Sequence, residues 1–141
     1  MDSIRLTYEV EGGDLIQAGE ASAQVKQALR RLGFDPDTIR RAAVCMYEGE
    51  INMVIHANGG TATVDIGLED ITITLADSGP GIPDIEQAMQ AGFTTAGETA
   101  RDLGFGAGMG LPNMKKYSDE MTVESTVGVG TTVIMVVKIS Q

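Results

Sequence analysis

The chain has 141 residues, of which 43% are hydrophobic, a length that suits one cored domain better than two. Twenty acidic and ten basic side chains give a formal net charge of -10, so we expect no nucleic-acid partner and no membrane partner. One cysteine excludes an internal disulfide, and no apolar run reaches the roughly 20 residues of a membrane-spanning helix. The N-terminus lacks the pattern of a signal peptide, and we therefore expect a cytoplasmic protein.

Hydrophobic periodicity predicts helices where apolar residues recur three and four apart, and strands where they alternate with polar residues. In chain order, the predicted elements are a strand at residues 4–10, helices at 14–32 and 36–58, strands at 61–68 and 71–77, helices at 83–91 and 111–118, and strands at 121–126 and 131–139. Helices and strands do not alternate as in a doubly wound fold. We therefore expect an α/β (α+β) two-layer sandwich over residues 1–141, with a mostly antiparallel mixed sheet of about five strands covered on one face by helices.

Glycine is unusually frequent, with 18 residues in the chain, and eight of them fall between Gly79 and Gly110. Glycine suits positions where the backbone needs a positive φ or where another group approaches it closely. The chain contains neither the P-loop motif nor the dinucleotide-binding motif. We therefore interpret this stretch as a loop built around a ligand in a site of another kind.

Glu48 and Asn52 lie four residues apart in the second predicted helix and therefore share one face of it. The apolar residues beside this pair predict the buried face of the helix: Val44, Tyr47, Ile51 and Ile55. Glu50 points away from that face, so we expect its side chain to be solvated. A carboxylate at a cleft edge can act as a general base, and a carboxamide offers a hard oxygen to Mg²⁺. An ordinary polar helix surface is the alternative interpretation of the same spacing.

Asp77 follows an apolar strand and precedes the turn that contains Gly79 and Gly81. The strand holds the aspartate rigidly, and the glycines allow a planar group to lie against the backbone. An aspartate that only stabilises the turn is the alternative.

Glycines up to Gly110 precede the helix predicted from Leu111, so backbone N–H groups would meet at a helix N-terminus, which attracts anions. Between Arg41 and Arg101 the chain has no lysine or arginine. Phosphates bound in this region would need a divalent cation and backbone amides for charge relief, helped at most by Arg101, Lys115 or Lys116. A flexible surface loop is the alternative.

Together these motifs resemble the N box, the two glycine boxes and the closing threonine of the GHKL ATPase superfamily, whose members share the Bergerat-type ATP-binding fold. The matching motifs are Glu48-x-x-x-Asn52, Asp77-x-Gly79-x-Gly81, Gly106-x-Gly108-x-Gly110-Leu111 and Gly130-Thr131-Thr132. Residues 92–95 and 108–112 are most similar to the bacterial anti-sigma factor and serine-protein kinase group. Within that group, residues 77–85 and the Gly-Ala-Gly…Leu-Pro pattern of residues 106–112 are similar to the stressosome switch-kinase branch.

The resemblance implies ATP and Mg²⁺ as cofactors. Glu48 would be the general base that deprotonates a target serine, and Asn52 would bind the Mg²⁺. Asp77 would accept a hydrogen bond from the adenine amine, with support from the Thr131 hydroxyl. The other residues implied to bind the nucleotide are Gly79, Gly81, Thr94, Thr95, Gly106, Gly108, Gly110 and Leu111.

The resemblance further implies partner switching, in which a serine of a STAS-domain antagonist protein is phosphorylated and a sigma factor or activator protein is bound. A homodimer is also implied. A non-catalytic regulator gated by nucleotide and a detached sensor-kinase domain are the alternatives. Two departures from the group concern the lid, lengthened at residues 98–105, and Gly49, which either allows close packing or indicates a looser site.

Two arginine pairs, Arg30-Arg31 and Arg40-Arg41, flank the turn between the first two predicted helices. Such charges usually form a solvated face. Because the chain is otherwise acidic, this cluster is also where an acidic partner would bind.

Overall fold

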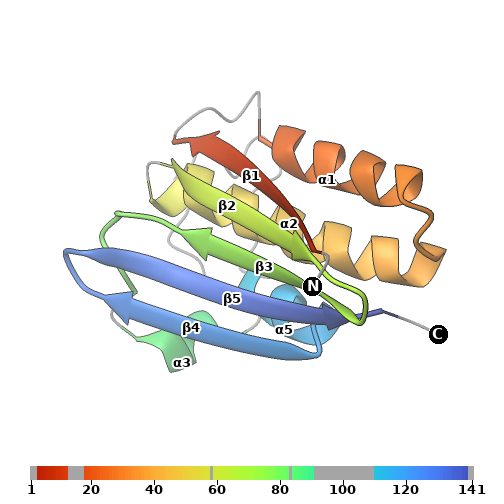
Figure 1. Ribbon diagram of the computed structural model, residues 1–141. Coiled ribbons are helices and arrows are strands. Elements are labelled where there is room, and N and C mark those ends of the chain that lie inside the picture. Colours follow the sequence, from red (N-terminus) through yellow and green to blue (C-terminus); the bar gives the residue numbers. More distant parts are fainter. Residues whose placement is uncertain (1–2, 13–17, 58, 83, 91–109, 140–141) are drawn as a thin grey trace.

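The chain folds into one sheet that lies against one layer of helices, as Figure 1 shows. This is a computed structural model, which describes residues 3–12, 18–57, 59–82, 84–90 and 110–139. The predicted α+β architecture, with five strands and helices on one face, is confirmed.

The sheet has the spatial strand order β1-β2-β3-β5-β4 in the described part of the chain. Its strands are β1 (Ile4–Glu11), β2 (Gly59–Ile66), β3 (Asp70–Ala76), β4 (Glu120–Thr126) and β5 (Gly130–Lys138). All four neighbouring pairs are antiparallel, so the sheet is not mixed. Strand β3 is therefore central, and its last residue, Ala76, is paired with a neighbouring strand on both sides.

The helices are α1 (Glu20–Arg31), α2 (Pro36–His56), α3 (Ile85–Ala88) and α5 (Gly110–Tyr117). Helix α2 starts as predicted, because the Asp35 side chain accepts a hydrogen bond from the Thr38 N–H at 3.0 Å. Helix α1 starts later than the predicted residue 14, since Gly19 has a φ of 98° and a left-handed residue cannot continue a helix. No helix in the described ranges is long and apolar enough to cross a membrane.

Helices α1 and α5 both pack against α2 and run antiparallel to it (Figure 1). The start of α1 is joined to Glu50, near the end of α2, and Gly110 at the start of α5 contacts Asn52. One end of the helical layer therefore combines the N-termini of α1 and α5 with the C-terminal half of α2. The opposite end combines the C-termini of α1 and α5 with the start of α2.

The hydrophobic core lies between the sheet and the helices, and alternate strand residues such as Val64, Ile73 and Met135 are fully buried in it. Helix α2 approaches the sheet closely at Gly49, where an added Cβ would collide with the Leu75 side chain. This contact explains a glycine that costs about 1 kcal/mol in helix propensity. Of the two interpretations of Gly49, close packing is confirmed.

Candidate nucleotide site

Glu48 and Asn52 face the N-terminal half of α5. The Glu48 side chain is half-buried, and the Asn113 side-chain amide donates a hydrogen bond to its Oε1 at 3.4 Å. The Asn52 carboxamide lies against Gly110, where an added Cβ would come within 2.9 Å of Oδ1. The structure therefore brings together the carboxylate and carboxamide of α2 and the first turn of α5, as the sequence predicted for Glu48, Asn52 and Gly110.

Burial raises the pKa of the Glu48 carboxyl above its ordinary value, and the hydrogen bond from Asn113 opposes this effect only in part. A carboxyl with a raised pKa holds its proton more strongly in the folded state than in the unfolded state. Its contribution to stability is therefore fully present below the unfolded pKa and is lost as the pH rises through the folded pKa.

Replacement of Glu48 by glutamine should remove this pH dependence. In the wild type, the free energy of unfolding should gain a stabilising contribution from Glu48 as the pH falls from about 7 to about 4, because protonation favours the folded form. Urea unfolding of both proteins across this range measures the difference between them. Parallel pH curves for wild type and variant would contradict the raised pKa.

Asp77 follows the last residue of β3 and is joined to the start of β5. Its Oδ1 accepts hydrogen bonds from the backbone N–H of Gly79 at 2.9 Å and of Thr131 at 3.1 Å. Its own N–H donates to the Thr131 carbonyl at 2.9 Å. These bonds fix the carboxylate and use Oδ1, so Oδ2 is the atom through which Asp77 could accept a hydrogen bond from a ligand.

Thr131 supports this arrangement by a route that the sequence did not predict. Its hydroxyl is paired with the Ser125 hydroxyl at 2.9 Å, and its backbone N–H binds Asp77. Ser125 also accepts a hydrogen bond from the Ile82 N–H at 2.7 Å. Ser125 therefore links the turn after Asp77 to strand β5, and nothing in the glycine and aspartate motifs had indicated it.

Gly79 and Gly81 allow the turn after β3 to pack against its neighbours. A Cβ on Gly79 would lie 2.6 Å from the Cα of Ala57, just beyond the end of α2. Gly81 has a φ of +80°, and a Cβ there would lie 2.6 Å from the Thr126 carbonyl. Packing within the protein thus accounts for both glycines, and their contact with an adenine ring stays a prediction.

The remaining predicted site residues divide into two groups. Thr94, Thr95, Gly106 and Gly108 lie outside the described residues. The Leu111 side chain is buried and belongs to the hydrophobic core. Leu111 can therefore face a ligand only through its backbone at the start of α5.

Glu50 contradicts the prediction that its side chain is solvated. The residue is 3% exposed, and its carboxylate accepts hydrogen bonds from the N–H groups of Ala21 at 3.1 Å and Ser22 at 2.9 Å. It therefore caps α1, whose own N-cap residue makes no side-chain hydrogen bond.

The error came from a predicted buried face that only partly overlaps the real one: of its residues, Ile51 is buried and Val44 and Ile55 are half-buried. The buried residues of this helix are Thr38, Ile39, Ala42, Cys45, Met46, Gly49, Glu50, Ile51, Met53 and Val54. Glu50 lies four residues from both Met46 and Val54, and this spacing could have placed it on the core face. The predicted residue Tyr47 is instead 38% exposed.

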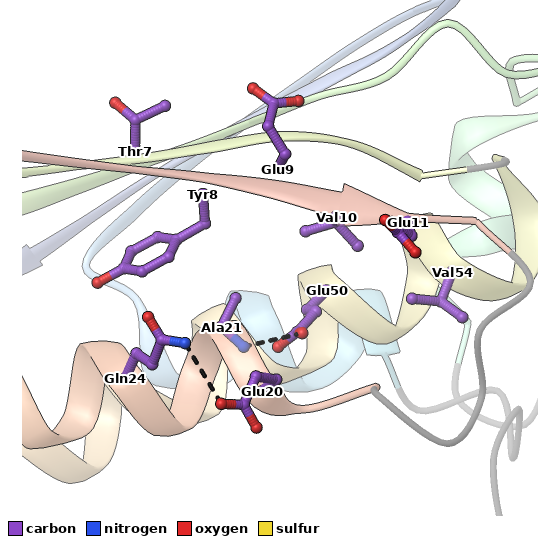
Figure 2. Close-up of a pocket in the computed structure, with 10 residues that line it drawn as sticks. All are labelled: Thr7, Tyr8, Glu9, Val10, Glu11, Glu20, Ala21, Gln24, Glu50 and Val54. Atoms are coloured by element: carbon purple, nitrogen blue, oxygen red, sulfur yellow. Dashed lines mark hydrogen bonds between the residues drawn. The ribbon is translucent and has the colours of Figure 1, made fainter.

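A cavity of about 500 Å³ lies between β1 and the helices α1 and α2, as Figure 2 shows. None of the predicted site residues that the structure describes lines it. Glu9, Glu11, Glu20 and Glu50 are among its lining residues, although the Glu9 side chain points away from the helices (Figure 2), and this acidic lining makes it a poor environment for a triphosphate. The cavity is therefore distinct from the candidate nucleotide site.

The donor groups present are compatible with Mg²⁺ held together with a nucleotide. In the parts of the chain that the structure describes, no group of three or more His, Cys, Asp or Glu side chains could hold a metal. Mg²⁺ commonly binds one or two protein oxygens and the phosphates of a substrate. Asn52, beside the first turn of α5, can supply such an oxygen.

The antiparallel sheet, the single helical layer and the polar face of α2 opposite the start of α5 are features of nucleotide-binding α+β proteins. A family model described as the histidine kinase-like ATPase domain matches residues 13–137. The chain therefore belongs to the histidine kinase-like ATPase family, and the predicted GHKL membership, with the ATP binding that it implies, is supported.

Two of the relatives with similar sequences illustrate the functions found among them. The anti-sigma F factor of Geobacillus stearothermophilus is 36% identical over 124 residues, which cover 82% of this chain and 82% of the relative. The serine/threonine-protein kinase RsbT of Bacillus subtilis is 32% identical over 122 residues, which cover 84% of each chain. The chain is thus similar to regulators of both kinds.

Two solved structures share the fold at low sequence identity. One contains the RsbU and RsbW domains of a Mycobacterium tuberculosis protein, with a TM-score of 0.61 and 17% identity; the match covers 100% of this chain and 33% of that one. The other is the mycobacterial sensor histidine kinase MprB, with a TM-score of 0.54, 16% identity, and coverage of 96% and 98%.

Proposed function

We propose that residues 1–141 act as one ATP-dependent protein-serine kinase domain in a cytoplasmic partner-switching system. The observation that carries this proposal is the half-buried Glu48 carboxylate, with a raised pKa, beside an asparagine that contacts the first turn of α5. A base of this kind suits proton removal from a hydroxyl. The similarity to a relative named as a serine/threonine-protein kinase supports the same conclusion.

In the proposed reaction, Glu48 accepts the proton of a serine hydroxyl on the protein substrate. The serine oxygen forms a bond to the γ-phosphorus of ATP, and the bond between that phosphorus and the β,γ-bridging oxygen breaks. The products are phosphoserine and ADP. Phosphoryl transfer of this kind depends mainly on positioning and charge stabilisation, with little covalent work by the protein.

The other site residues bind and orient the nucleotide. Asn52 holds Mg²⁺, which supplies charge stabilisation to the phosphates when it is bound. Asp77 accepts a hydrogen bond from the adenine amine through Oδ2, while Thr131 holds Oδ1. Gly110 and the predicted lid residues donate backbone amides. Because no lysine or arginine lies between Arg41 and Arg101, the proposal makes Mg²⁺ obligatory.

The protein substrate is a STAS-domain antagonist, and a sigma factor or activator protein is the other binding partner. Similarity to a relative named as an anti-sigma F factor supports the second role. It also supports a second candidate function, in which the chain binds its partner in a nucleotide-dependent manner and phosphorylates nothing.

The test is phosphate transfer from γ-labelled ATP to a purified STAS-domain protein of the same organism. Glu48→Gln should lower the transfer rate by at least about 100-fold, because a general base contributes about 10²–10⁴-fold. Its affinity for ATP should change by less than about threefold, since Glu48 is not assigned to nucleotide binding. Removal of Mg²⁺ with EDTA should abolish transfer.

The second candidate makes the opposite prediction. It requires no transfer by the wild type, with ATP-dependent partner binding that Glu48→Gln leaves intact. Transfer by Glu48→Gln at the wild-type rate would overturn the role of Glu48 as the base.

A further inference from the structure

Basic side chains collect at the end of the helical layer where α1 turns into α2. Arg30 and Arg31 lie in the last turn of α1, and Lys115 and Lys116 lie in the last turn of α5. Arg40 lies near the start of α2. Since α1 and α5 run antiparallel to α2, all three helices bring these residues to the same end of the layer (Figure 1). We name these five residues the basic end.

A neighbouring arginine, Arg41, has an internal structural role. Its side chain is 18% exposed and forms ion pairs with Asp37 at 3.0 Å and Asp119 at 2.9 Å. It also donates a hydrogen bond to the Lys138 carbonyl at 2.6 Å. Arg41 therefore connects α2 to strand β5 and compensates the carboxylates of Asp37 and Asp119.

The cations of the basic end are mostly uncompensated. Arg30, Arg31, Lys115 and Lys116 are exposed, and none forms an ion pair with a carboxylate of the described residues. Cations in the last turns of α1 and α5 also interact favourably with the helix dipoles. Arg40, near the positive end of α2, forms an exposed ion pair with Asp37 at 3.3 Å.

Apolar and aromatic groups accompany these charges. Leu32, which caps the C-terminus of α1, is 47% exposed. The Tyr117 ring lies beneath two cations, with the Arg40 guanidinium 5.8 Å and the Lys116 ammonium 5.4 Å from its centroid. Arginine and tyrosine together with exposed leucine are typical of protein interfaces.

We propose that the basic end is a docking surface for an acidic segment of the partner protein. Charge complementarity selects this occupant, because the net charge of -10 means that the rest of the molecule is strongly acidic. Duplex DNA or an anionic lipid bilayer would be repelled by the acidic surface of the protein over most of the area of contact. A protein with a local group of carboxylates needs to approach only this end of the molecule, where the carboxylates of Asp37 and Asp119 are already paired with Arg41.

The position of this surface suits a protein substrate. Arg40 precedes Glu48 by eight residues of one continuous helix, which corresponds to about 12 Å along its axis. A partner held at the basic end could therefore place a serine near Glu48. This inference depends on the proposed function only in that the docked partner is the protein substrate or the regulated protein.

The test compares two charge-reversal variants with a matched control. The variants are Arg30→Glu and Lys115→Glu, and the control is Arg5→Glu on strand β1, which changes the net charge by the same amount away from the basic end. Because Arg5 pairs with Asp65, urea unfolding checks that the control variant remains folded. Binding of a purified STAS-domain protein and of a purified sigma factor of the same organism is measured at about 50 and about 500 mM salt. ATP affinity is measured in parallel and should be unchanged in all three variants, because every altered residue is exposed.

Each basic-end variant should weaken partner binding at least tenfold at low salt, and high salt should reduce this difference. If transfer occurs, KM for the protein substrate should rise while kcat stays unchanged. A carbodiimide should cross-link Lys115 or Lys116 to aspartate or glutamate of the partner.

Three outcomes would overturn the proposal: equal weakening by the control variant, partner binding that none of the variants affects, and no binding of either partner to the wild type. Tighter binding of duplex DNA or anionic vesicles than of either protein would replace the acidic segment with that ligand. A loss of transfer in Glu48→Gln, or its absence in the wild type, bears on the proposed function alone, since the docking test measures binding.

Discussion

Replacement of Glu50 by alanine should lower the free energy of unfolding by about 3 kcal/mol. The substitution removes the buried acceptor of two backbone N–H groups, from Ala21 and Ser22, at the start of α1. Each buried donor left without a partner costs about 1–3 kcal/mol. The cost should be high here because Glu50 is 3% exposed, so water has little access to replace it. Urea unfolding measures the loss.

Two further variants define the origin of this effect. Glu20→Ala removes an exposed carboxylate from the same helix terminus and should cost less than about 0.5 kcal/mol. Glu50→Gln keeps one oxygen acceptor and should have an intermediate cost. If Glu50→Ala is no less stable than Glu20→Ala, the carboxylate of residue 50 is not the cap of α1.

Replacement of Asp77 by asparagine should weaken ATP binding by about 100-fold with little effect on stability. The asparagine Oδ1 can still accept hydrogen bonds from the Gly79 and Thr131 N–H groups, so the turn should be retained. Its Nδ2 replaces Oδ2, and an amide nitrogen cannot accept a hydrogen bond from the adenine amine. The variant loses a charge-assisted hydrogen bond, and the asparagine Nδ2–H group is placed against the N–H group of the adenine amine. Together these two effects should cost about 3 kcal/mol, which is about 100-fold in affinity. Calorimetric titration with ATP measures it.

A matched control for Asp77 is Asp84→Asn. Asp84 also accepts a backbone hydrogen bond, from the Gln87 N–H at 3.0 Å, but it caps the short helix α3 and has no assigned contact with the nucleotide. Its ATP affinity should equal that of the wild type. Wild-type affinity in Asp77→Asn would exclude Oδ2 as the adenine acceptor.

Local sequence signals predicted those parts of the structure that depend on neighbours in the chain. Asp35 and Pro36 identified the start of α2 because a cap and its helix are adjacent in sequence. The late start of α1 was missed, since the conformation of Gly19 and the packing of Tyr47 against it are tertiary features.

The same distinction between motif-based and tertiary features applies to the candidate site. The resemblance to the GHKL superfamily implied that Asn52 and Gly110 belong to one site, and the structure brings them into contact. Spacing could not predict the Glu50 cap or the Ser125 hydroxyl, because each acts on a segment remote in sequence. The division of labour between the Thr131 backbone and hydroxyl likewise depends on its neighbour in β4.

The contact between Gly49 and Leu75 lies between two parts of the candidate site. Gly49 directly follows the proposed base Glu48, and Leu75 lies two residues before the proposed adenine acceptor Asp77. A larger residue at position 49 would collide with the Leu75 side chain, which would have to move within the core next to the segment that carries Asp77. The absence of a side chain at residue 49 therefore allows the helix that carries the proposed base to pack closely on the strand that leads to the proposed adenine acceptor.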